Sequence, residues 1–242
     1  MHQRLLIAFL ALTVSSTALA QHDDESTPRI EEYDHNALPV TGFESIMADA
    51  ADDYQYNYDS VLADIARWSE SSFVNVSTIG NSVQGRPLWQ LSITSPANII
   101  VPRKVVAIHV RTHPNEQAVT YVINAMIDQL LSSDPRMRRM LEKVVFNIIP
   151  MYNPDGVELR LGRTNANGVD LEREWDKPSP AIEAAHLKTR YAEMMSSPTP
   201  INVMLNFHSD SRCDRFFVFH VASATSEAYA QLERRFIDAV VR

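Results

Sequence analysis

The sequence predicts an α/β fold, in which a mostly parallel or mixed central sheet carries helices on both faces. Short apolar runs of strand length, KVVAIHV (104–110) and VVFNIIP (144–150), alternate with longer segments whose apolar residues recur at helical spacing. The composition agrees, because 45% hydrophobic and 21% charged residues are ordinary for a globular protein with a core. We therefore expect an α/β/α arrangement.

The first half of the chain supplies the clearest periodic patterns. Gly85 marks a turn, and the runs that follow it are apolar enough for buried strands. In chain order, we expect a helix containing Val61, Leu62, Ile65 and Trp68, a turn and strand over 82–94, a strand over 104–110, a helix over 116–131 and a helical piece at 137–143 after Pro135.

The second half continues the alternation of strands and helices. YNPDG (152–156) has the composition of a turn. The expected elements are a strand over 144–150, the turn at 152–156, a loop over 163–175, a helix over 180–195, strands over 201–209 and 215–222, and a helix over 226–241. No internal repeat or low-complexity stretch is present.

The first twenty residues have the pattern of a secretory signal peptide. Arg4 precedes an apolar run from 5 to 14, and Ala18-Leu19-Ala20 supplies a small-residue cleavage site. The run is too short to span a bilayer. We therefore expect a signal peptide over 1–20 that is cleaved after about Ala20, an acidic segment over 21–56, one catalytic domain over 57–242, and a secreted or periplasmic protein.

The charge of the chain limits its partners. The net charge is −8 with a pI near 5.5, and no basic block appears. This balance argues against nucleic-acid binding. The sequence does not determine an oligomeric state.

Two histidines and a glutamate lie where strands end. His113 and Glu116 follow the strand over 104–110, and His208 ends the strand over 201–209. In such sheets ligands collect beyond the carboxyl ends of the strands, so these side chains are expected at one rim. Two imidazoles and a carboxylate are a ligand set for catalytic zinc. The alternative is a loop histidine and a first-turn glutamate that is favoured by the helix dipole.

Five segments between about Ile79 and Ser209 resemble the zinc carboxypeptidase family (M14 peptidases, related to carboxypeptidase A). They are GNSVQGRPLWQLSIT, HPNE, MYNPDG, RTNANGVDLEREW and NFHS, and they occur in the family's order. The resemblance implies that His113, Glu116 and His208 bind one Zn²⁺. It also implies a hydrolase that uses metal-activated water to cleave an amide bond near the C-terminus of a peptide or peptide-like substrate.

Other roles are implied by the same resemblance. Asp170 would accept the free ring N–H of His113 and fix its orientation. Arg163 would stabilise the oxyanion that develops at the scissile carbonyl. Arg173 would grip the terminal carboxylate of the substrate with two parallel hydrogen bonds. Without the motif, Asp170 would be assigned to a turn cap and both arginines to surface ion pairs.

Glu172 departs from the family pattern, which has asparagine in D-L-N-R where this chain has DLER. A carboxylate there would repel a free substrate carboxylate or pair with Arg173 and neutralise it. This leads to the hypothesis that the substrate is not a standard free-acid peptide. The alternative function is a peptidoglycan-type amidopeptidase or a deacylase on the same scaffold.

The general base is not identified in the sequence. The family's glutamate base lies on a strand well after the third zinc ligand, and this chain ends at Arg242. Glu227 and Glu233 fall in a helix-like run and are poor candidates. We therefore expect the carboxypeptidase-like domain to be incomplete at its C-terminus. A non-catalytic zinc-binding or peptide-binding fragment is the second alternative.

Overall fold

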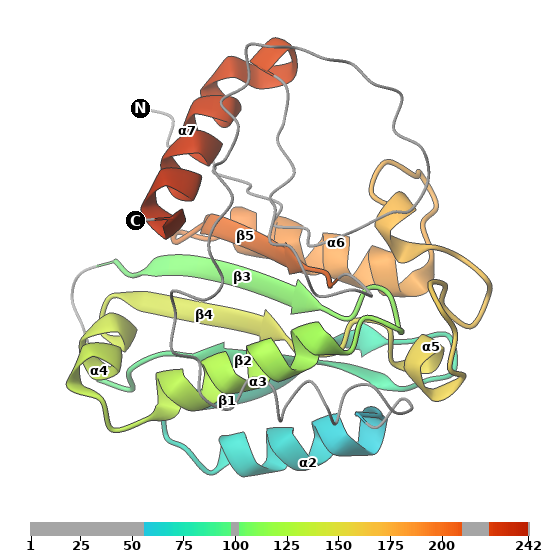
Figure 1. Cartoon of the computed structure of the whole chain (residues 1–242), viewed down its shortest axis with the longest axis horizontal. Coiled ribbons are helices and arrows are strands. Elements are labelled where there is room, and N and C mark those ends of the chain that lie inside the picture. The colour runs from blue at the N-terminus through green and yellow to red at the C-terminus, as the bar shows by residue number, and fades with distance from the viewer. Residues whose placement is uncertain (1–55, 98–101, 210–222, 242) are drawn as a thin grey trace.

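A computed structural model describes residues 56–97, 102–209 and 223–241 of the chain (Figure 1). The elements are α2 (Tyr58–Ser69), β1 (Val74–Asn81), β2 (Pro87–Ile93), β3 (Lys104–Val110), α3 (Ala118–Leu131), α4 (Pro135–Leu141), β4 (Val144–Ile149), α5 (Pro154–Glu158), the 3₁₀ turn η2 (Leu171–Arg173), α6 (Ile182–Met195), β5 (Ile201–Phe207) and α7 (Ser223–Val241). Within these ranges no helix is both long and apolar enough to cross a bilayer.

The strands form one five-stranded mixed sheet in the order β1-β2-β4-β3-β5. β3 pairs in parallel with β4 and with β5, whereas β2 is antiparallel to both of its neighbours. Helices α2 and α3 cover one face of this sheet, and α6 lies on the other (Figure 1). The predicted α/β/α architecture is therefore confirmed, and the sheet is mixed.

Three elements differ from the sequence prediction. β1 was not predicted, because VNVSTIGN is a half-exposed strand without an apolar run. The predicted turn at 152–156 continues into α5, since Pro154 starts the helix and the Asn153 side chain accepts a hydrogen bond from the Gly156 amide. α7 contains the predicted final helix but starts at Ser223 and bends at Ser226. Three predicted segments lie outside the described residues: the signal peptide, nearly all of the acidic segment over 21–56, and the strand over 215–222.

Apolar side chains fill both faces of the sheet. On the α2/α3 face, the buried residues are Tyr56, Val61, Ile65, Trp68, Leu91, Ile93, Ile108, Val110, Val119, Ile123, Ile127, Leu130, Leu141, Ile148, Met151 and Val157. On the α6 face they are Val105, Ala107, Ile149, Tyr152, Leu171, Leu187, Tyr191, Met194, Ile201 and Met204. Both clusters include residues of β3 and β4, so these two strands are covered from two sides, as parallel strands require.

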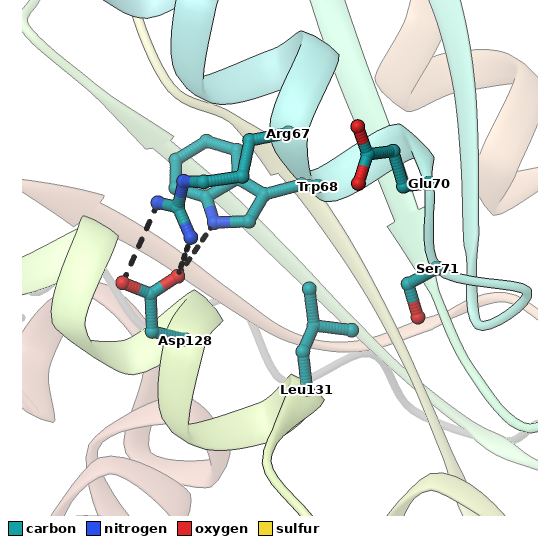
Figure 2. A pocket seen from close by; sticks show the side chains of 6 residues that line it. All are labelled: Arg67, Trp68, Glu70, Ser71, Asp128 and Leu131. Atoms are coloured by element: carbon teal, nitrogen blue, oxygen red, sulfur yellow. Dashed lines mark hydrogen bonds and ion pairs between the residues drawn. The ribbon is translucent and has the colours of Figure 1, made fainter.

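A polar contact joins α2 to α3 at the edge of the first cluster. Asp128 accepts hydrogen bonds from the indole N–H of Trp68 at 2.7 Å and from Arg67 at 2.8 Å. Figure 2 shows these three side chains beside a shallow pocket that Leu131 also lines. Its residues connect the two helices.

Asp155 joins the first hairpin to α5. This fully buried carboxylate accepts hydrogen bonds from the Ser82 hydroxyl, the Gln84 backbone N–H and the Arg86 guanidinium, each at 2.7 Å. These contacts give Asp155 a structural role. They hold the β1–β2 turn against the segment that follows β4.

Replacing Asp155 with alanine should destabilise the fold strongly. The change leaves the partly buried Arg86 guanidinium, the buried Ser82 hydroxyl and the Gln84 backbone amide without their acceptor. Unsatisfied buried groups of this kind typically cost about 1–3 kcal/mol. Urea denaturation measures the loss. Asp176→Ala, at an exposed acidic residue, is the control and should change stability by less than about 0.5 kcal/mol. Equal stability of the two variants would contradict the assigned role.

His109 of β3 is packed within the second cluster as a neutral ring. Its Nδ1 forms a 2.8 Å hydrogen bond with the Tyr191 hydroxyl, and the rings of Tyr152 and Trp175 lie beside it. Burial lowers the pKa of His109 to about 3. His109 is therefore a packed, hydrogen-bonded histidine of the core.

This burial makes stability depend on pH. The folded pKa of about 3 lies below the unfolded value of about 6.5, so the stabilisation is complete above pH 6.5 and is lost as the pH falls toward 3. The difference in unfolding free energy between wild type and His109→Gln should shrink by roughly 1.4 kcal/mol per pH unit between about pH 6 and 4. Denaturation curves measured at stepped pH test this. A constant difference would show that the buried ring does not resist protonation.

Candidate metal centre

The loop after β3 carries the first two candidate ligands. Arg111 leaves the strand with a positive φ of 61°, which turns the chain sharply before His113. Its buried guanidinium donates to the Thr120 hydroxyl at 3.0 Å and to the Pro114 carbonyl at 2.6 Å. The loop is therefore tied to the start of α3, and Glu116 is placed just before that helix.

The NPDG segment supports this loop from the side. The Asn153 amide donates to the carbonyls of Thr112 and Thr164, each at 3.1 Å. Gly156 packs so closely that an added Cβ would meet Pro114 and the Thr164 carbonyl. Only glycine allows this approach, so α5 joins the candidate metal loop to the loop that contains Arg163.

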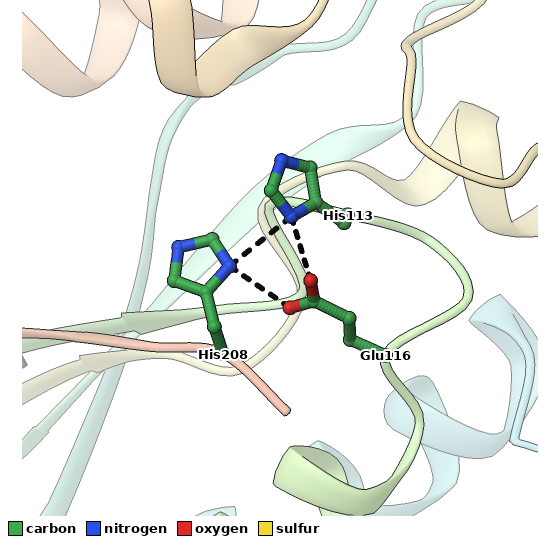
Figure 3. Close-up of side chains that lie close together, drawn as sticks. All are labelled: His113, Glu116 and His208. Atoms are coloured by element: carbon green, nitrogen blue, oxygen red, sulfur yellow. Dashed lines mark hydrogen bonds and ion pairs between the residues drawn. The ribbon is translucent and has the colours of Figure 1, made fainter. Parts of the chain in front are cut away.

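His113, Glu116 and His208 meet as the sequence predicted (Figure 3). Nδ1 of His113 lies 2.7 Å from Glu116 Oε1, and Nδ1 of His208 lies 2.9 Å from Glu116 Oε2. The two Nδ1 atoms are 3.1 Å apart, and both rings are buried. Three side chains from two distant segments thus direct their ligand atoms at one point.

The donor set fits a zinc ion. Nε2 of His113 lies 3.2 Å from Asp170 Oδ1, and Nε2 of His208 lies 3.3 Å from Glu172 Oε2. The hydrogen bond to Asp170 assigns the ring proton of His113 to Nε2 and leaves a lone pair on its Nδ1. Glu172 lies at ion-pair distance from Nε2 of His208 and favours the same arrangement in that ring. Two lone pairs and a carboxylate facing one another repel unless a cation lies among them, and such sets are typical of catalytic zinc.

The electrostatics of the three candidate ligands are coupled. Burial acts to raise the pKa of Glu116, but hydrogen bonds to His113 and His208 outweigh it and lower that pKa. Burial acts to lower the pKa of His208, but Glu116 and Glu172 raise it to about 9. The pocket therefore favours an ionised Glu116, and a proton on His208 would leave as a cation binds.

Asp170 connects the candidate ligands to two arginines. Its Oδ1 faces His113, while Oδ2 lies 2.7 Å from Arg163 Nε and 3.3 Å from Arg173 Nε. Burial acts to raise the pKa of Asp170, but Arg163 and His113 outweigh it and lower that pKa. Both arginine side chains are more than half exposed, so their outer N–H groups remain accessible at the rim.

Glu172 is directed inward. It was expected to face a substrate carboxylate or to pair with Arg173, but Arg173 pairs with Asp170. Glu172 Oε2 lies beside His208 and accepts a 2.7 Å hydrogen bond from the Asn206 amide. Sequence reasoning missed Asn206, although its position two residues before His208 in a strand places it on the same face.

The fold and the group of His113, Glu116 and His208 define a class of protein. It is the class of α/β proteins with a candidate metal centre at the carboxyl ends of parallel strands. Within that class, the family model described as zinc carboxypeptidase matches residues 60–240. The chain therefore belongs to the zinc carboxypeptidase family, which is a family of hydrolases that implies Zn²⁺ as its metal.

Relatives and solved structures agree with this family. Cytosolic carboxypeptidase 6 from Mus musculus is 38% identical over 146 residues, which are 58% of this chain and 27% of the relative. The Homo sapiens protein of that name is 37% identical over 146 residues, 58% of this chain and 29% of the relative. The chain thus spans less than a third of the length of these curated relatives.

Among solved structures, a metallo-carboxypeptidase from Burkholderia cenocepacia has a TM-score of 0.58 and 26% identity, covering 64% of this chain and 42% of that one. A metallo-carboxypeptidase from Pseudomonas aeruginosa, in complex with (2-guanidinoethylmercapto)succinic acid, has a TM-score of 0.56 and 26% identity. It covers 64% of this chain and 40% of its own. These structures support the carboxypeptidase-like sheet.

The comparisons contradict the predicted export of the protein. The matched relatives from Mus musculus, Homo sapiens and Caenorhabditis elegans are named cytosolic carboxypeptidases, which points away from a secreted or periplasmic location. The export prediction rested on residues 1–20, which precede the matched region. An apolar run of about ten residues is a weak physical signal, because buried segments of soluble proteins have the same length and composition.

The site should bind one zinc ion per chain. Removing a ligand by His208→Ala leaves only two ligand side chains, so zinc should be lost on gel filtration against a weak chelator. Metal analysis of the eluted protein gives the stoichiometry. His109→Gln alters a buried histidine outside the ligand set and should keep its zinc. Equal zinc content in wild type and His208→Ala would exclude this site.

Proposed function

We propose that this chain carries the metal centre of a zinc-dependent metallocarboxypeptidase that hydrolyses an amide bond near the C-terminus of a peptide. The convergence of His113 Nδ1, His208 Nδ1 and the Glu116 carboxylate is the observation that supports it. Zinc held there would lower the pKa of water to roughly 7 and polarise the scissile carbonyl. The names of the matched carboxypeptidases support the C-terminal position of the cleaved bond.

The two arginines suit the remaining substrate contacts. Arg163 is held by Asp170 through Nε, so its other N–H groups can point toward a developing oxyanion. Arg173 is the more exposed of the two, with 78% of its side chain accessible. A guanidinium in that position can take a terminal carboxylate with two hydrogen bonds. We assign these roles to Arg163 and Arg173 within the proposal.

The general base is left unassigned. Within the described residues, the three carboxylates nearest the centre are already engaged, since Glu116 contacts both histidines, Asp170 contacts His113, and Glu172 contacts His208. Glu227 and Glu233 lie on α7, as the sequence indicated. A base would add typically about 10²–10⁴-fold to the rate, so turnover by this chain can be slow while metal and substrate still bind.

The function is tested with paired peptides that end in a free acid or an amide. Zinc-loaded protein should release the C-terminal amino acid from the free acid, chelation should stop the release, and added zinc should restore it. Amino-acid analysis of the products identifies the cleaved bond. Stoichiometric zinc with cleavage at internal bonds, or equal rates on both peptides, would contradict a carboxypeptidase.

Arginine variants should separate the two substrate contacts. Arg163→Gln should lower kcat by roughly 10²–10³-fold with little change in KM, because an oxyanion contact forms in the transition state. Arg173→Gln should raise KM for the free acid and leave the amide unaffected. Arg136→Gln, on the exposed side of α4, is the control. Identical kinetics in all three variants would remove both assigned roles.

A further inference from the structure

We propose that Glu172 is a positioning residue for the third zinc ligand, holding the His208 ring through its Nε2 instead of meeting a substrate carboxylate. This inference rests on the proposed zinc site. Glu172 stands in DLER at the position where the resembling motif has asparagine. Its contacts therefore decide whether the extra negative charge acts on the substrate or on the metal centre.

The contacts of Glu172 point toward the metal centre. Its Oε2 lies 3.3 Å from His208 Nε2 and accepts a 2.7 Å hydrogen bond from the Asn206 side chain. The Glu172 amide donates to Asp170 Oδ1 at 3.1 Å. About 29% of the Glu172 side chain is exposed, so most of it is covered by protein, with the carboxylate against β5.

Both sides of this contact are fixed by the fold. Asn206 pairs with His109 in the β3–β5 ladder, and its side chain oxygen lies 3.3 Å from the Thr112 hydroxyl. Asn206 and His208 are both fully buried. Glu172 is fixed from the other side, because Asp170 caps the 3₁₀ turn η2 that contains it. The Glu172 carboxylate thus connects the η2 loop to β5 beside the candidate metal centre.

Each candidate histidine ligand therefore has a carboxylate beside its outer nitrogen, hydrogen-bonded to His113 and at ion-pair distance from His208. Asp170 faces Nε2 of His113, and Glu172, two residues later, faces Nε2 of His208. A carboxylate on the outer nitrogen fixes ring orientation and increases the electron density on the ligating nitrogen. Since Arg173 pairs with Asp170, Glu172 does not neutralise it. The substitution in DLER strengthens the metal centre and leaves the arginine available.

Zinc affinity is the direct readout. Competition with a chromophoric chelator, at fixed pH and salt, gives Kd for wild type, Glu172→Leu and Glu172→Gln. Loss of such a carboxylate typically weakens metal binding by about 10–100-fold, which we expect for Glu172→Leu. Glu172→Gln keeps an acceptor oxygen but loses its charge, so a smaller weakening is expected. Cobalt-loaded protein should show a shifted visible spectrum in both variants, because the His208 ring is less constrained.

Glu174→Gln is the matched control. It makes the same charge change in the same loop, where the Glu174 carboxylate accepts from the Ala181 amide, away from both histidines. Glutamine can keep that bond, so zinc affinity should stay within about twofold of wild type, because solvent and salt screen more distant charges. Thermal unfolding without metal shows whether each variant is folded.

The outcomes separate the two proposals. Wild type without zinc would overturn the proposed function itself. If wild type binds zinc and folded Glu172→Leu binds it with equal affinity, only this inference is overturned. If Glu172→Leu does not fold, equal zinc affinity and an unchanged cobalt spectrum in Glu172→Gln would overturn the inference. A relative kcat/KM for free acid over amide that rises in Glu172→Gln would also overturn it, because Glu172 would then face the substrate.

Discussion

The parallel pairing of β3 with β5 is the constraint on which the candidate site depends. Val110 pairs with Phe207, so both strands end at the same edge of the sheet. His208 follows β5 at once, and His113 comes from the loop after β3. Residues almost a hundred positions apart are therefore brought to 3.1 Å. A shift of one residue in this register would direct alternate side chains to the other face.

Around this edge of the sheet, three carboxylates lie close together and their negative charge is balanced by histidines and arginines. Glu116, Asp170 and Glu172 lie within contact distance of the two candidate histidine ligands, and Arg163 and Arg173 contact Asp170. Paired and hydrogen-bonded in this way, the buried carboxylates avoid most of the penalty of an isolated charge. The arrangement gives each imidazole one nitrogen for support and one for a metal, while the exposed parts of the arginines remain at the rim.

Buried polar residues away from the centre keep its loops in place. Asp155 holds the β1–β2 turn, and Asn153 ties together the two loops on either side of α5. Glu183 on α6 accepts from the Val83 amide and from the Asn165 side chain, which fixes the loop leading to Asp170. Fully satisfied networks of this kind rigidify a structure. The geometry of the candidate ligands is thus supported by residues that lie outside the His113, Glu116 and His208 group.

The sequence alone determined the alternation of strands and helices, because apolar runs and helical spacing reflect burial directly. It also placed His113, His208 and Glu116 at one rim of the sheet, because parallel strands end at a common edge. The sequence did not predict the half-exposed strand β1 or the short helix α5, since neither has a strong apolar pattern. The N-terminal pattern predicted export, which the relatives contradict. Only the tertiary structure decided the direction of Glu172, because its partners lie on β5, far along the chain, and no local pattern records which side of a loop a carboxylate faces.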